Sequence, residues 1–140
     1  MLGPLAQNGG YTPTHALLVG SPAIDAGTNT GCPATDQRGI SRPQPAGGTC
    51  DIGAYESETY PLTIISAHGT VARSPNKATY HEGDAVKLTA TPNSGWHFVK
   101  WTGGLTGAAN PGSVIIHGNT SVTANYAPNT YWLYLPLIRH

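Results

Sequence analysis

The chain has 140 residues, enough for one ordinary domain or two small ones, and its 18 glycines and 12 prolines favour many turns. Seven basic and seven acidic side chains give no net charge, which excludes the electrostatic footprint of a protein that binds nucleic acid or anionic lipid. With 39% hydrophobic residues at zero net charge, intrinsic disorder is excluded as well.

Residues 1–57 show little hydrophobic periodicity and are predicted to be mostly turns. A short helix is predicted over residues 13–18, because Thr12 can cap it and Gly20 can end it, and a short strand is predicted over residues 51–56. This half has too few apolar residues for a sizeable core, so we expect it to lie against another part. The first residues lack the pattern of a secretory signal, and we expect the chain to be a fragment of a longer protein.

The two cysteines, Cys32 and Cys50, flank a stretch rich in proline and glycine. In an exported protein such a pair favours a disulfide, and closing a loop of about 18 residues stabilises by roughly 3 kcal/mol in the chain-entropy model. The alternative is two unrelated buried thiols.

Residues 58–128 alternate short strands with turn signals, which predicts a small sandwich or barrel-like β domain. In the strand predicted near Val86, Leu88 and Ala90, these three side chains share one face. The predicted strands cover residues 62–67, 70–74, 85–91, 96–101, 113–117 and 121–126. The tail, residues 129–140, is apolar but much shorter than the roughly 20 residues that span a bilayer.

The first half contains an ordered series of short motifs: Leu2-Gly3-Pro4-Leu5, Asn8-Gly9-Gly10, Thr14-His15-Ala16-Leu17-Leu18, Ser21-Pro22-Ala23-Ile24-Asp25-Ala26-Gly27, Thr35-Asp36-Gln37-Arg38-Gly39, Arg42-Pro43 and Cys50-Asp51-Ile52-Gly53-Ala54-Tyr55-Glu56. In these motifs it resembles the C-terminal end of bacterial surface proteins of the right-handed parallel β-helix type, the polymorphic outer-membrane-protein-like or choice-of-anchor proteins. The resemblance implies that residues 1–57 are the terminal segment that closes a β-helix.

The second half contains the pattern Gly69-Thr70-Val71, Pro75, Tyr80, Gly83-Asp84, Val86-Lys87-Leu88-Thr89-Ala90-Thr91-Pro92, Gly95-Trp96, Phe98, Trp101, Gly103, Asn110-Pro111 and Ser121-Val122-Thr123-Ala124-Asn125-Tyr126. In this pattern it resembles the divergent internalin B-type repeat, a small β module that acts as a spacer or adhesive module in bacterial surface proteins. The resemblance implies an extracellular or cell-surface location.

The six histidines show no metal-ligand spacing, so no metal site is predicted. They are His15, His68, His81, His97, His117 and His140. Four carboxylates of the first half, Asp25, Asp36, Asp51 and Glu56, are candidates for a glycosidase pair or a calcium site. The structural interpretation is favoured, in which Asp36 holds N–H groups of its own turn or pairs with an arginine, and Asp25 caps a turn.

Among the aromatic residues, Trp96 and Phe98 are two apart and are predicted to share the core face of a strand. In a regular strand Trp101 points to the opposite face, where it either covers the domain or is exposed and stacks on a sugar ring. Tyr131, Trp132 and Tyr134 of the tail are candidates to dock on the second domain or on a partner chain.

The patterns predict a mainly β chain, and the two resemblances imply a β-helix-type terminal segment rich in turns over residues 1–57, a small all-β repeat domain over residues 58–128, and a short tail. The predicted function is that of a non-catalytic structural or adhesive module of a secreted or cell-surface bacterial protein, without catalytic residues, cofactor or metal. Expected partners are a cell-surface polysaccharide or a protein of a host or neighbouring cell. The alternatives are a carbohydrate-binding accessory module, which an exposed Trp101 would favour, or the remnant of a polysaccharide-degrading β-helix enzyme.

Overall fold

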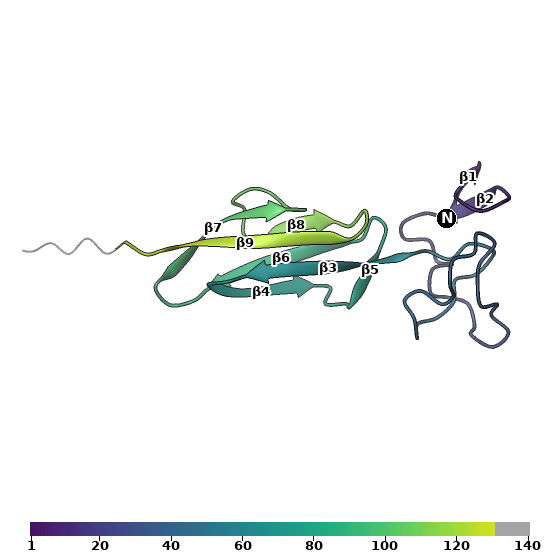
Figure 1. Cartoon of the computed structure of the whole chain (residues 1–140), viewed down its shortest axis with the longest axis horizontal. Helices are drawn as coiled ribbons and strands as arrows, with labels where there is room; N and C mark the ends of the chain where they lie inside the picture. The colour runs from purple at the N-terminus through teal and green to yellow at the C-terminus, as the bar shows by residue number, and fades with distance from the viewer. Residues whose placement is uncertain (131–140) are drawn as a thin grey trace, which may run out of the picture.

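The structure of the chain is a computed structural model that describes residues 1–130. Nine β-strands and no helix occur within this range, so the prediction of a mainly β chain is confirmed. Residues 1–57 form one hairpin and a set of turns, which lie at one end of an elongated β module (Figure 1). The predicted tail falls almost entirely outside the described residues.

The helix predicted over residues 13–18 is wrong. Strand β2 (Thr14–Leu17) pairs antiparallel with β1 (Leu2–Ala6) instead. A six-residue helix gains few backbone hydrogen bonds for the cost of its first turn, whereas the paired strands satisfy their backbone groups across the hairpin. Asn8 adds to the hairpin, because its amide donates to the carbonyl of Thr14 at 2.8 Å.

The strand predicted over residues 51–56 is also wrong, since this segment consists of bends. The backbone N–H groups of Asp51 and Glu56 donate to side-chain carboxylates, at 3.0 and 2.9 Å, and not to a neighbouring strand. Gly53 has a positive φ of 110°, a conformation that a regular strand excludes.

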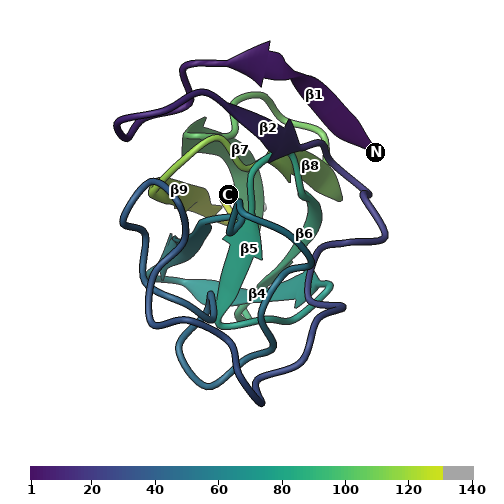
Figure 2. The ribbon, with the colours of Figure 1, turned by 90° about the vertical axis from the view of Figure 1, so that its right-hand side faces the viewer.

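The module consists of two sheets that enclose one core, seen end-on behind residues 1–57 in Figure 2. The larger sheet has the strand order β5-β3-β9-β7 and the smaller one β4-β6-β8. The strands are β3 (Thr59–Ser66), β4 (Gly69–Ser74), β5 (Thr79–His81), β6 (Ala85–Pro92), β7 (Trp96–Gly103), β8 (Gly112–Ile115) and β9 (Thr120–Pro128). Each strand predicted for this half is present, and β5 was not predicted.

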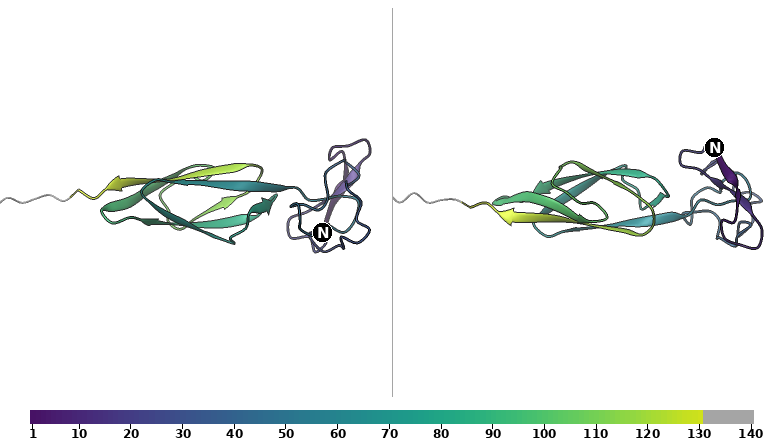
Figure 3. Two further views of the ribbon diagram at one scale, coloured as in Figure 1. Left: turned by 60° about the horizontal axis from the view of Figure 1, so that its bottom comes forward. Right: turned by 90° about the horizontal axis from the view of Figure 1, so that it is seen from above.

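The first and last strands of the module, β3 and β9, lie side by side and run parallel. Leu62 lies opposite Thr120, and Ser66 lies opposite Ala124. Every other strand pair among residues 1–130 is antiparallel. The chain therefore enters the module next to residues 1–57 and leaves it at the far end (Figure 3).

The core lies between the two sheets and takes side chains from both. The alternation predicted for β6 is confirmed, because Val86, Leu88 and Ala90 are all buried. Tyr80 of β5 is fully buried, and its hydroxyl donates to the carbonyl of Pro75 at 2.8 Å. The remaining buried members are Leu62, Trp101, Val114, Ile116, Val122 and Ala124.

Candidate functional site

Three carboxylates and two arginines form a buried network within residues 1–57, where a larger domain would have an apolar core. Arg38 pairs with Asp36 at 2.8 Å, and Arg42 pairs with Glu56 at 2.8 Å. The arginine side chains are 5% and 6% exposed and both carboxylates are fully buried, so these ion pairs are largely removed from solvent. Asp51 is buried beside them. Buried charges of this kind persist only when they are paired and hydrogen-bonded.

Asp36 holds the turn that follows it, as the sequence predicted. One carboxylate oxygen accepts from the backbone N–H groups of Arg38 and Ile40, at 2.7 and 3.0 Å. The other accepts from the backbone N–H of Glu56 and from Nε of Arg38, each at 2.9 Å. Burial alone raises the pKa of Asp36, but these hydrogen bonds outweigh it and hold the pKa below its ordinary value.

Asp51 and Glu56 tie further backbone segments together. Asp51 accepts from the backbone N–H groups of Asp25 and Ser57, at 2.7 and 2.6 Å. Burial raises the pKa of Asp51; these two hydrogen bonds oppose the rise, and the charges of Glu56 and Asp25 add to it. Glu56 accepts from the backbone N–H groups of Gln44 and Asp51, at 2.7 and 3.0 Å. The network therefore closes the loops of the first half on one another.

The predicted disulfide is present and covalently links the loops that contain residues 32 and 50. Cys32 and Cys50 are bonded, with their Cα atoms 6.7 Å apart, and Cys50 is 2% exposed. Next to Cys50, the backbone carbonyl of Asp51 accepts from Arg42, so the disulfide and the ion-pair network meet at residues 50–51.

Strand β7 contains a β-bulge that changes the direction of its aromatic side chains. Phe98 pairs with Tyr126 and Lys100 with Asn125, so Val99 is an extra residue without a partner on β9. The bulge reverses the expected alternation and places Trp101 on the same face as Phe98, with their ring centroids 4.9 Å apart. No feature of the sequence around Val99 indicates this insertion.

Trp101 is consequently a core residue, 1% exposed, and its Nε1–H donates to the carbonyl of Ala109 at 2.9 Å. A side chain this buried presents no ring face to a ligand, which corrects the alternative that Trp101 stacks on a sugar. The prediction that Trp96 fills the core is also wrong: it is half-buried and stacks on His68 at 3.5 Å. Phe98 packs against the core as predicted, although it is only partly buried.

The histidines are scattered over the molecule. His15, His97 and His117 bond Gly3, Asn129 and Glu82, respectively. Among the described residues no three His, Cys, Asp or Glu side chains gather in a way that could hold a metal ion. His140, like Tyr131, Trp132 and Tyr134, lies outside the described part of the chain.

At the junction between residues 1–57 and the β module, side chains from the two parts contact each other. His81 at the end of β5 faces Asp25, with Nε2 3.3 Å from a carboxylate oxygen. Asp25 has a positive φ of 55° and thus sits in a turn, as predicted, but it also reaches the module. Val19 packs so closely on Gly83 that a Cβ added there would lie 2.3 Å from a methyl group.

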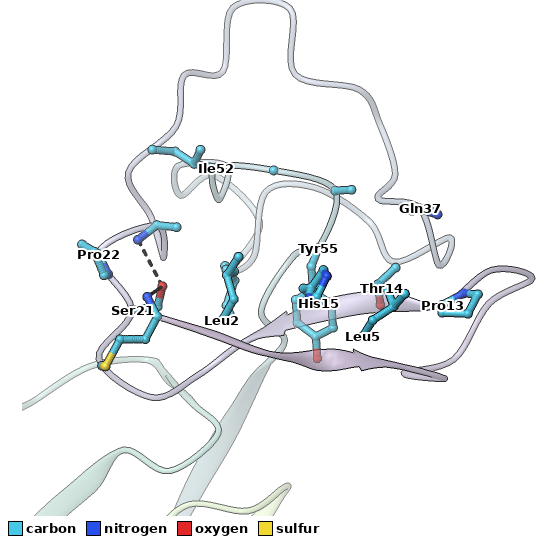
Figure 4. Close-up of a pocket in the computed structure, with 15 residues that line it drawn as sticks. Leu2, Leu5, Pro13, Thr14, His15, Ser21, Pro22, Gln37, Ile52 and Tyr55 are labelled. Carbon is cyan, nitrogen blue, oxygen red and sulfur yellow. Dashed lines mark hydrogen bonds between the residues drawn. The ribbon is translucent and has the colours of Figure 1, made fainter.

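An apolar groove of about 500 Å³ opens between the hairpin β1–β2 and the loop that carries Ile52 (Figure 4). Leu2 and Leu5 of β1 line one side, and Ile52 and Tyr55 line the other. Leu2, Leu5 and Ile52 remain 60%, 62% and 55% exposed, although they are large apolar side chains. Sequence reasoning missed this groove; its one signal was the apolar character of residues 1–5.

Residues 60–130 match the protein family described as the divergent InlB B-repeat domain. No curated protein and no solved structure matches the chain significantly. InlB-type repeat domains occur in bacterial surface proteins, and the disulfide fits an extracellular protein. Within residues 1–130 no helix has the length and apolar character needed to cross a membrane. The matched region spans half of the chain, and the chain therefore belongs to the divergent InlB B-repeat domain family.

Proposed function

We propose that this chain is a non-catalytic structural module that spaces and displays neighbouring parts of a secreted or cell-surface bacterial protein. The observation that carries the proposal is the parallel pairing of β3 with β9, which makes the chain enter the module at one end and leave it at the other. The family match supports the surface setting.

The length of the last strand, β9, sets the distance by which the module separates the parts of the protein at its two ends. β9 has nine residues, which at about 3.3 Å each span roughly 30 Å. Residues 1–57 add to this length, because they lie beyond the start of β3 (Figure 1). His81 and Asp25 meet across the junction and Val19 packs on Gly83, so the two halves are held in one orientation. A part attached after Thr130 is thus kept apart from residues 1–57.

We also propose that the chain catalyses no reaction, and the hydrogen bonds that the buried carboxylates accept support this. Both oxygens of Asp36, Asp51 and Glu56 already accept hydrogen bonds from the chain itself. A general acid or base needs an oxygen that can reach a substrate proton. These carboxylates instead bind the backbone of their own loops.

Residues 1–57 are proposed to be the terminal segment of a parallel β-helix in the longer protein. The sequence resemblance described above supports this, together with the architecture of the segment. Its loops are closed by the ion-pair network and by the disulfide between Cys32 and Cys50, so it needs no large apolar core of its own. Such a segment is suited to end a stack of coils.

Small-angle X-ray scattering of the full chain, extrapolated to zero concentration so that it reports on single copies, tests the spacer. A globular chain of 140 residues has a radius of gyration of about 14 Å, and we expect a value well above this. A radius near that of a globule would contradict the spacer. Incubation with insoluble plant and bacterial polysaccharides tests the rest: we expect neither co-sedimentation nor released reducing ends, and either one would favour a carbohydrate-directed function.

A further inference from the structure

The groove between β1–β2 and the Ile52 loop is suited to an apolar occupant. Its volume of about 500 Å³ lies in the range of pockets that bury ligands, about 300–1,000 Å³. No Asp, Glu, Lys or Arg side chain lines it among the described residues. Its main polar groups are already bonded: His15 Nδ1 pairs with the Gly3 carbonyl at 2.8 Å, and Ser21 accepts from the amino group of Met1 at 2.9 Å.

The groove favours insertion of side chains over addition of a strand. Pro4 lies in the middle of β1 and offers no N–H, so this edge is a poor template for a new backbone ladder. Leu2, Leu5 and Ile52, by contrast, each leave more than half of their surface in water. Covering such side chains is favourable in proportion to the apolar area removed from water.

The chain itself contains a segment of matching chemistry. Residues 131–140 include two tyrosines, one tryptophan, three leucines and one isoleucine, and the first charged side chain among them is Arg139. Tryptophan and tyrosine are typical anchors in protein interfaces, and the leucines and the isoleucine add apolar area that is favourable to remove from water. An uncharged, aromatic and leucine-rich segment therefore fits a groove that has no charged side chain.

The segment does not reach the groove of its own chain. Ten residues extend at most about 35 Å, and they follow Thr130, beyond the far end of β9. The nine residues of β9 already span roughly 30 Å, and this strand runs away from residues 1–57. A segment that folded back would use almost its whole reach to retrace β9, and the groove lies beyond the start of β3 (Figure 1).

We propose that the groove binds residues 131–140 of a second copy of this chain. The donor segment follows the end of β9, whereas the acceptor groove lies beyond the start of β3, so the contact is heterologous. Each bound copy leaves one free groove and one free segment. The expected assembly is an open head-to-tail row of copies and not a closed dimer.

The test uses full-length variants in sedimentation velocity over a wide concentration range. The groove variant is Ile52→Asp and the segment variant is Leu133→Asp with Leu135→Asp. Ile65→Asp is the matched control, because Ile65 lies on β3 and is 52% exposed, compared with 55% for Ile52. We expect the unmodified chain and the control to associate alike, and each of the other two variants to associate at least about tenfold more weakly.

Mixing the groove variant with the segment variant gives the sharper result. The groove variant still offers an intact segment and the segment variant an intact groove, so the mixture is expected to form one-to-one pairs that grow no further. A monomeric unmodified chain at every concentration would overturn the proposal. So would association that survives the segment variant, which would indicate groove-to-groove pairing, or a mixture that forms no pairs.

Discussion

The burial of Trp101 makes a prediction that separates it from Trp96. Trp101→Ala removes a side chain that is 1% exposed and packs on Phe98, and truncations of this kind cost about 3–5 kcal/mol. Trp101→Phe keeps an aromatic ring but leaves the Ala109 carbonyl without its donor, for a cost of about 1–3 kcal/mol. Trp96→Ala should cost less than about 2 kcal/mol, since this ring is half-buried and stacks on His68.

Urea unfolding followed by circular dichroism measures these differences, because the fluorescence signal changes when a tryptophan is removed. Tyr11→Ala serves as the control: Tyr11 is fully exposed, and its replacement should change the free energy of unfolding by less than about 0.5 kcal/mol. If Trp96→Ala proved as destabilising as Trp101→Ala, the bulge at Val99 would not place Trp101 in the core.

Three further predictions concern the buried network, the disulfide and the bulge. Folding lowers the pKa of Asp36, so the stability that this carboxylate contributes is complete above its ordinary pKa of 3.8 and is lost as the pH falls through the lower folded value. Measuring the free energy of unfolding at decreasing pH should show this loss, and Asp36→Asn should abolish the loss. Replacing Cys32 and Cys50 by serine should destabilise residues 1–57 by roughly 3 kcal/mol, while the rate of amide exchange in β3–β9 stays unchanged. Faster exchange in β3–β9 would contradict the expectation that the disulfide stabilises residues 1–57 alone. Deleting Val99 should turn Trp101 away from the core and lower the unfolding midpoint in urea, whereas a variant as stable as the unmodified chain would show that the bulge is dispensable.

Much of the module could be predicted because its signals are local. On β6, apolar and polar side chains alternate, with Val86, Leu88 and Ala90 on the buried face. Glycines with positive φ, such as Gly83 and Gly95, mark turns between strands. Strand alternation and turns are set by residues that are adjacent in the chain, so both can be predicted from the sequence alone.

The disulfide and the turn held by Asp36 could be predicted, but the bulge at Val99 and the apolar groove could not, because these two features depend on contacts between distant residues. The bulge at Val99 is a property of the register between β7 and β9, and valine by itself is an ordinary strand residue. The groove arises where β1 faces Ile52, some fifty positions along the chain. The helix predicted over residues 13–18 failed for another reason: its cap signals took no account of the preceding segment, which pairs with it as β1 in a hairpin.

The parallel alignment of β3 and β9 also bears on how the module responds to pulling. A load applied between residues 1–57 and Thr130 draws these two neighbouring strands in opposite directions along their length. The hydrogen bonds of the register from Leu62–Thr120 to Ser66–Ala124 are then loaded together in shear and do not open one after another. The module should therefore resist tension along its long axis far better than a hairpin peeled from its end.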